Sequence, residues 1–81
     1  MQVSLFGRLA DLSGQRSLND VPDGLADGEA LRAWLSDAQP HLAEILAHPG
    51  TRLVLDNEIT DWQAPLAGAG DVAIIPVVSG G

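Results

Sequence analysis

The residues with the most distinctive chemical potential stand at the end of the sequence, Val77-Val78-Ser79-Gly80-Gly81. Glycine has no Cβ atom, so a Gly-Gly pair is slim, free in φ and ψ, and able to enter a narrow channel. The α-carboxylate of Gly81 is then the functional group at the tip. The Ser79 hydroxyl has no base near it in the sequence, which argues against a role as a nucleophile. A frayed end or an expression scar is the other explanation of such a terminus.

A terminal carboxylate can do useful chemistry once it is activated. Its pKa is about 3.3–3.7, so it is ionised at pH 7 and is a poor electrophile. Reaction with ATP would convert it into an acyl-adenylate, which is a strong electrophile. Transfer of sulfide to that acyl group would leave a thiocarboxylate, a softer and better nucleophile. The slim segment that ends at Gly81 meets the steric requirement of both steps.

Other catalytic motifs are missing from the sequence. It contains no cysteine and no lysine, which excludes a thiolate zinc site, a cysteine nucleophile and a Schiff base. His41 and His48 have no carboxylate at metal-ligand spacing, so we expect ordinary surface histidines. Gly68-Ala69-Gly70 precedes an apolar run and predicts a turn, not a phosphate-binding loop. We therefore expect a protein that is not itself an enzyme and that binds no cofactor or metal.

The composition describes one small, acidic, globular domain. The chain has 81 residues, of which 46% are hydrophobic, and a net charge of −7. Such a charge repels phosphate groups, so we expect no binding to nucleic acids or to membrane surfaces. It either serves solubility or steers the protein towards a basic partner. No signal peptide and no membrane-spanning run is recognisable, and we expect a cytoplasmic location.

The elements that must position the terminus can be predicted from hydrophobic patterning, beginning with two strands. The residues Gln2–Phe6 alternate in character and predict a strand. Gly7–Gly14 is expected to be a connection. Arg16–Val21 is a weaker strand prediction, ended by the turn signal Pro22-Asp23-Gly24. The two strands would form a hairpin-like pair with a long loop.

A helical segment follows. Asp27 is a suitable N-cap residue, and an apolar stripe with helical spacing comes after it. The stripe consists of Leu31, Trp34, Leu35 and Ala38. Pro40 suits the first position of a second short helix, which His48-Pro49-Gly50 would end. Trp34 is expected in the core, whereas Trp62 could either pack internally or face a partner.

The remainder of the sequence predicts three strands. Arg52–Leu55 and Glu58–Thr60 would flank a tight turn at Asp56-Asn57. The apolar run Val72–Val77 is typical of a strand in the middle of a sheet. Together these patterns predict an α+β fold with one main helix packed on one face of a mixed sheet.

Two segments resemble the small subunit of molybdopterin synthase. Leu5-Phe6-Gly7-Arg8-Leu9-Ala10-Asp11-Leu12-Ser13-Gly14 is similar to the first strand and loop of that family. Pro65-Leu66 and Gly70-Asp71-Val72-Ala73-Ile74-Ile75-Pro76-Val77-Val78-Ser79-Gly80-Gly81 are similar to its last strand and tail. The resemblance covers both ends and the total length, while the middle agrees in pattern. It implies a β-grasp, ubiquitin-like domain over residues 1–76 and a flexible tail over residues 77–81.

The resemblance also implies a function. Gly81 would be adenylated by an enzyme similar to the ubiquitin E1 core, at the expense of ATP, and a sulfurtransferase would supply the sulfur of its thiocarboxylate. The tail, Val77, Val78, Ser79, Gly80 and Gly81, would insert into the large synthase subunit. There it would donate sulfur to the pyranopterin precursor of the molybdenum cofactor. The partner-facing apolar patch of the family maps to Phe6, Ile59 and Ile75, for which core or sheet packing is the alternative.

The sequence departs from the family at several positions. Aromatic residues are frequent in the family where Ile74 and Ile75 stand, and a second proline is frequent at Val77. A basic residue is common at Ala10, and Asp-Gly-Asp is common where Ala69-Gly70-Asp71 stands. These differences concern the contacts with the partner and not the chemistry of the tail.

Two further functions agree with the same terminus. The first is a sulfur carrier of this fold for another product, such as thiamine thiazole, cysteine or a thiolated metabolite. The second is a ubiquitin-like tagging or interaction module, in which Gly81 would form an isopeptide bond with lysines of other proteins. The sulfur acceptor distinguishes the two carriers, and an isopeptide product would identify the module.

Overall fold

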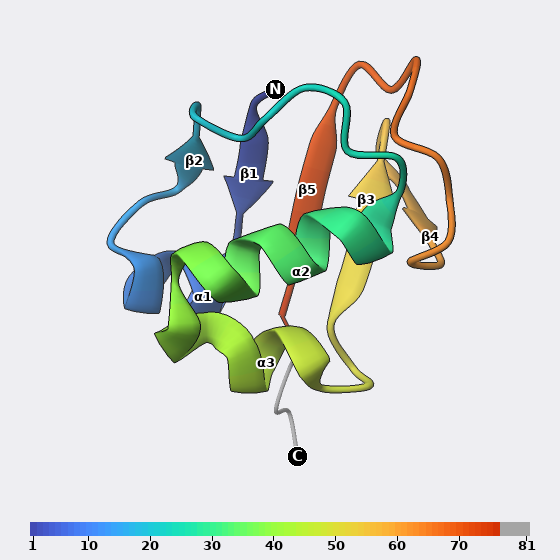
Figure 1. Cartoon of the computed structure of the whole chain (residues 1–81). Helices are drawn as coiled ribbons and strands as arrows, with labels where there is room; N and C mark the ends of the chain where they lie inside the picture. The colour runs from blue at the N-terminus through green and yellow to red at the C-terminus, as the bar shows by residue number, and fades with distance from the viewer. Residues whose placement is uncertain (77–81) are drawn as a thin grey trace.

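The computed structural model describes residues 1–76, which form a five-stranded sheet with helices on one face (Figure 1). The strands lie in the order β2-β1-β5-β3-β4. The elements along the chain are β1 Val3–Leu5, α1 Gly7–Ser13, β2 Ser17–Leu18, α2 Gly28–Ala38, the 3-10 turn η1 Pro40–Leu42, α3 Ala43–Ala47, β3 Arg52–Leu55, β4 Glu58–Thr60 and β5 Val72–Ile75.

The strand β5 occupies the middle of the sheet. It is parallel to β1, with Leu5 opposite Ile74, and antiparallel to β3, with Leu53 opposite the same Ile74. A strand flanked on both sides has its backbone hydrogen bonds satisfied within the sheet, which suits its apolar sequence. The outer pairs β1–β2 and β3–β4 are antiparallel. The mixed sheet with helices on one face confirms the predicted β-grasp-like α+β fold.

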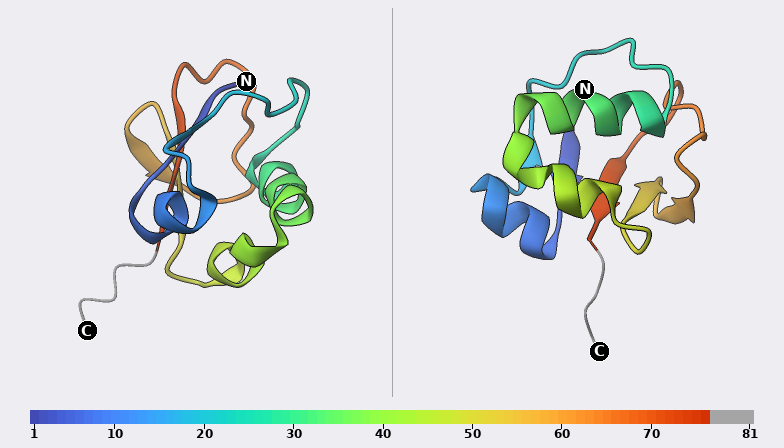
Figure 2. Two further views of the ribbon diagram at one scale, coloured as in Figure 1. Left: turned by 90° about the vertical axis from the view of Figure 1, so that its left-hand side faces the viewer. Right: turned by 60° about the horizontal axis from the view of Figure 1, so that its bottom comes forward.

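The hydrophobic core lies between the sheet and the helices. In Figure 2 the helices α2 and α3 lie together on one side of the sheet. Four leucines on this side are completely buried. Leu31 and Leu35 belong to α2, Leu42 belongs to η1 and Leu46 belongs to α3. The sheet contributes the alternate residues that point to this side, which are Val3, Leu5, Leu18, Leu53, Val72 and Ile74. This alternation confirms the strand periodicity expected from the sequence.

The prediction of a plain connection over Gly7–Gly14 was wrong, because Gly7–Ser13 forms α1. Phe6 precedes the helix and its side chain makes no capping hydrogen bond, so the usual sequence signal for a helix start is missing. At the other end, the Gly14 N–H donates to the Ala10 carbonyl at 2.9 Å. So short a helix is marginal by itself, and the complete burial of Leu9 supplies the tertiary stabilisation.

The helix predicted after Asp27 is confirmed as α2. The Asp27 carboxylate accepts a hydrogen bond from the Ala30 N–H at 2.9 Å, as an N-cap residue should. Within the predicted stripe, Trp34 is only partly buried and Ala38 is exposed. The surface of α2 that is buried against the sheet is therefore narrower than the predicted apolar stripe. Trp34 lies at the edge of this buried surface.

The predicted strands are present but mostly shorter. The first covers Val3–Leu5 and the second only Ser17–Leu18. The last one is β5, Val72–Ile75, and Val77 lies outside the described residues. The predicted turn at Asp56-Asn57 is confirmed, with positive φ values of 50° and 69°. No helix within residues 1–76 is long and apolar enough to cross a membrane.

Candidate functional site

The site is built around the point where β5 ends. Pro76 follows β5 and is buried. It packs against Gly7, where a Cβ atom would come within 3.1 Å of the Pro76 Cγ atom. On the opposite side, Arg52 pairs with Ile75 across the β3–β5 ladder. The chain therefore leaves the sheet between the β1–α1 junction and the first residue of β3.

The residues predicted to carry the chemistry, Val77, Val78, Ser79, Gly80 and Gly81, lie outside the described residues. Their roles as inserted tail and reactive terminus stay predictions. The structure instead defines the anchor of this segment, because Ile75 and Pro76 are held by the sheet and by Gly7. An anchor in the central strand gives the following residues a constant starting point.

The face of the sheet opposite the helices carries an exposed apolar area. Val54 is opposite Ile59 in the β3–β4 ladder, so both side chains lie on the same face. Ile75 shares this face, since its neighbour Ile74 points into the core. Phe6 does so as well, because it follows the buried Leu5 in extended conformation. We refer to Phe6, Val54, Ile59 and Ile75 as the outer sheet face.

Exposure decides between the two interpretations of these residues. Phe6 is 51% exposed and Ile59 is 66% exposed, so neither belongs to the core. Ile75 is partly buried within the sheet. Large apolar side chains that stay exposed on one face of a sheet are candidates for an interaction surface, although β5 and β3 separate Phe6 from Ile59 here. The register of the sheet thus places on one face the three residues that the sequence assigned to a partner-facing patch, with Phe6 next to Ile75 and Ile59 two strands away. Their contact with a partner stays a prediction.

The histidines take structural roles at the surface. The His41 Nε2 atom lies 3.1 Å from the Leu12 carbonyl oxygen, which connects η1 to α1. The His48 Nδ1 atom accepts a hydrogen bond from the Gly50 N–H at 2.9 Å. In the part of the chain that the structure describes, no group of three His, Cys, Asp or Glu side chains is placed to hold a metal ion.

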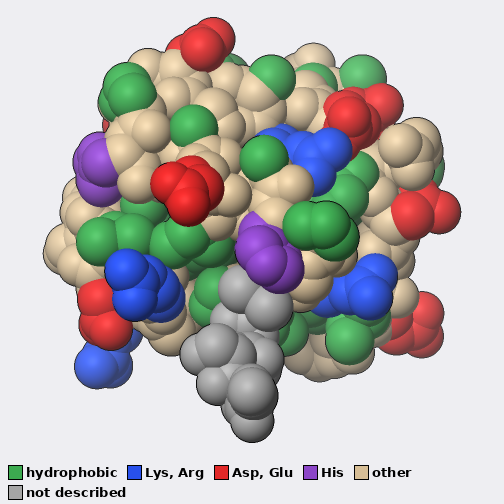
Figure 3. Space-filling model, turned by 90° about the horizontal axis from the view of Figure 1, so that it is seen from below, with side chains coloured by type: hydrophobic (Ala, Val, Ile, Leu, Met, Phe, Trp, Pro, Cys, Tyr) green, Lys and Arg blue, Asp and Glu red, His purple; other side chains and the backbone are tan. Residues whose placement is uncertain are grey.

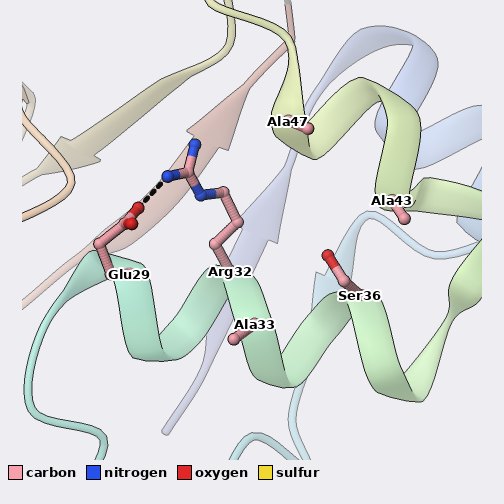
Figure 4. Close-up of a pocket in the computed structure, with 6 residues that line it drawn as sticks. All are labelled: Glu29, Arg32, Ala33, Ser36, Ala43 and Ala47. Carbon is pink, nitrogen blue, oxygen red and sulfur yellow. Dashed lines mark hydrogen bonds and ion pairs between the residues drawn. The ribbon is translucent and has the colours of Figure 1, made fainter.

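A hollow lies between α2 and α3 (Figure 4). It is lined by Glu29, Arg32, Ala33, Ser36, Ala43 and Ala47. Arg32 forms an ion pair with Glu29, and its guanidinium lies 4.5 Å from the ring centre of Trp62. This stacking gives Trp62 an internal packing partner. Sequence reasoning missed the contact because no local pattern links residues so far apart.

The chain is similar to known proteins over its whole length. The profile of the ThiS family matches residues 3–81, which includes the terminal Gly-Gly. Among solved structures, the crystal structure of SAMP1 from Haloferax volcanii is 30% identical in sequence, with a TM-score of 0.76. The match covers 100% of this chain and 98% of SAMP1. No curated protein sequence matches the chain.

Proposed function

Because the chain belongs to the ThiS family of ubiquitin-like sulfur carriers, we propose that it is the small subunit of a molybdopterin synthase. The family match, which extends through Gly81, supports the sulfur-carrier part of the proposal. The choice of molybdopterin synthase rests on the resemblance of the two end segments of the sequence. An activating enzyme of the E1 type adenylates the Gly81 carboxylate and releases pyrophosphate. A sulfide equivalent from a sulfurtransferase then displaces AMP and leaves a thiocarboxylate. The thiocarboxylate sulfur bonds to the pyranopterin precursor, and hydrolysis of the acyl–sulfur bond by water leaves the sulfur on the precursor and regenerates the carboxylate.

The geometry of the anchor supports a carrier role. A carrier has to present one reactive atom at the end of a slender segment, while the body of the protein supplies recognition. The residues after Pro76 can span at most about 18 Å. A partner that covers Phe6 and Ile75 on the outer sheet face can therefore receive the segment in an adjacent channel. Recognition and chemistry are divided between the folded body and the tail, and the chain needs no catalytic side chain of its own.

The activation step is tested by intact mass spectrometry. The protein is incubated with ATP, a sulfide source and its cognate activating enzyme. We expect a mass gain that corresponds to exchange of one oxygen for one sulfur, localised to Gly81. A variant without Gly81 serves as the matched control and should gain no mass while unfolding at the same temperature. An unchanged mass, with an enzyme that is active on a control carrier, would refute a sulfur-carrier function and favour a tagging or interaction module.

The identity of the acceptor needs a second experiment. The thiocarboxylated protein is mixed with the large subunit of molybdopterin synthase and the cyclic pyranopterin precursor, and the products are analysed by mass spectrometry. Formation of the dithiolene product, with return of the carrier to its original mass, is the expected result. A thiocarboxylate that is consumed only in thiazole or cysteine synthesis would assign the chain to another pathway of the same chemistry.

A further inference from the structure

The arginines of this acidic chain are concentrated at one end of the sheet. Arg52 begins β3 and lies opposite Ile75, the last residue of β5. Arg8 follows Gly7, the residue that packs against Pro76. Both arginine side chains are exposed. They stand on opposite sides of the point where the chain leaves the sheet.

A third arginine belongs to the same end. The carbonyl of Arg16 accepts a hydrogen bond from the Leu5 N–H at 2.8 Å, which places Arg16 beside the end of β1. Its side chain is also exposed. We refer to Arg8, Arg16 and Arg52 as the basic collar. Figure 3, which views the molecule from below, shows arginine and histidine side chains on this face, with Asp and Glu side chains between and around them.

The opposite end of the sheet is acidic. The N–H of Asp56 donates to the carbonyl of Asp71 at 2.9 Å, so these residues adjoin where β3 ends and β5 begins. Glu58 pairs with Leu55 at the same end. The sheet therefore has carboxylates at the start of its central strand and guanidinium groups at the end. The two ends of the central strand thus differ in the charged side chains next to them, within a chain whose net charge is −7.

The collar arginines form no ion pair within residues 1–76, although Asp11 lines the same hollow as Arg16. The ion pairs formed within residues 1–76 join Met1 to Asp23 and Arg32 to Glu29. Arg32 is thus occupied in packing and pairing, whereas the collar arginines have no such partner in this part of the chain. Exposed guanidinium groups without an internal partner are suited to bidentate recognition of carboxylates.

We infer that the basic collar docks an acidic surface on the activating enzyme, around the channel that receives the tail for adenylation. The inference rests on the proposed function, and it names the partner's complementary surface, a rim of carboxylates around the entrance of the channel. A rim of carboxylates repels the acidic surface of this protein and attracts the collar arginines. The long-range electrostatic field therefore turns the protein so that the tail faces the partner before the two proteins touch. Orientation before contact increases the association rate more than it increases the affinity.

The collar is too far from the reacting group to serve the adenylate. When the segment after Pro76 enters a channel, Gly81 can lie up to about 18 Å beyond the anchor. The arginines then face the rim and not the phosphate of the acyl-adenylate. Nucleic acid is disfavoured as the partner, because the rest of the surface repels its backbone.

A test that needs no natural partner uses a deca-glutamate peptide and the isotopically labelled full chain. At low salt, nuclear magnetic resonance should show peptide-induced shifts at the amides of Gly7, Arg8, Thr51 and Arg52. These shifts should disappear at high salt and be reduced in Arg8→Gln and Arg52→Gln. The exposed Gln63→Glu variant has the same net charge as either arginine variant and is the matched control. The inference would be overturned if Gln63→Glu reduced the peptide-induced shifts as much as the arginine variants do, or if the shifts were spread over the whole surface. Tighter binding of a DNA oligonucleotide than of the peptide at the same salt would also overturn it.

The second test uses the cognate activating enzyme and measures association by stopped flow. At low salt we expect Arg8→Gln and Arg52→Gln each to slow association roughly 2- to 5-fold, with a weaker salt dependence than the unmodified chain. Gln63→Glu should have a much smaller effect. Unchanged rates in the arginine variants, with normal thiocarboxylate formation, would overturn the collar and leave the proposed function intact. If the unmodified chain forms no thiocarboxylate, the proposed function fails, while the peptide titration still decides on the collar.

Discussion

Gly7 lies directly against Pro76, where a Cβ atom at position 7 would come within 3.1 Å of the proline Cγ atom. Gly7 also has a φ of +53°, a left-handed conformation that L side chains rarely adopt. The contact joins the start of α1 to the residue that follows β5. It therefore sets where the chain leaves the fold, between Arg8 and Arg52.

Substitution of Gly7 tests this contact. We expect Gly7→Ala to lower the free energy of unfolding by about 1–3 kcal/mol, because it adds a close contact to the backbone strain. Gly14→Ala is the matched control, since Gly14 has a φ of +76° but no atom within 4 Å of its hypothetical Cβ. Urea denaturation of both variants separates the two effects. Equal losses would show that the contact with Pro76 contributes nothing.

Gly28 is the tightest position in the fold among the described glycines. A Cβ atom there would lie 2.5 Å from Leu53 Cδ2 and 2.8 Å from the Trp62 carbonyl oxygen. Alanine has the higher helix propensity by about 1 kcal/mol, but overpacking against a backbone carbonyl costs about 1–3 kcal/mol or more. Gly28→Ala should therefore destabilise the protein in thermal unfolding. Ser36→Ala, also within α2, should change stability little, and a stabilised Gly28→Ala variant would contradict the close packing.

Truncation of Phe6 separates recognition from stability. Phe6 is half exposed, so Phe6→Ala should lower the free energy of unfolding by less than about 1 kcal/mol. Leu5→Ala, on the opposite face of the same strand, removes a buried side chain and should cost about 2–5 kcal/mol. Calorimetric titration with the large synthase subunit should show weakened binding for Phe6→Ala. A variant that loses stability as Leu5→Ala does would assign Phe6 to the core.

The interaction between the Met1 ammonium and the Asp23 carboxylate should make the melting temperature depend on pH. The hydrogen bond that the Met1 ammonium donates to Asp23 is the larger cause, and the positive charge of the ammonium is the second cause, of a pKa of the Asp23 carboxyl below its usual value. A carboxyl with a lowered folded-state pKa stabilises the fold above its unfolded-state pKa of about 3.9, and this contribution is lost as pH falls through the folded-state pKa. Asp23→Asn should therefore melt at a lower temperature than the unmodified protein at pH 7. At about pH 2 the two melting temperatures should converge, and a constant difference at all pH values would refute the assignment.

Several parts of the fold could be predicted from the sequence because their signals are local. The Asp27 side chain and the leucines that follow it act within one or two helical turns, so α2 is visible as a pattern. Asp56-Asn57 favours a tight turn wherever it occurs, and the structure has a positive φ at both residues. The uninterrupted apolar run beginning at Val72 predicts a central strand for the same kind of reason. The chemistry proposed for Gly81 came from the residue types of the terminus together with the family resemblance, and it stays a proposal.

Only the tertiary structure decided the rest. The helix α1 has no capping side chain at its start and depends on the burial of Leu9, a contact that no local pattern announces. The outer sheet face exists because strand register, set by long-range pairing, places Phe6 and Ile59 on the side without helices. The basic collar likewise requires β5 to lie between β1 and β3. Sequence determines the local preferences, whereas pairing between distant strands determines which residues surround the end of β5.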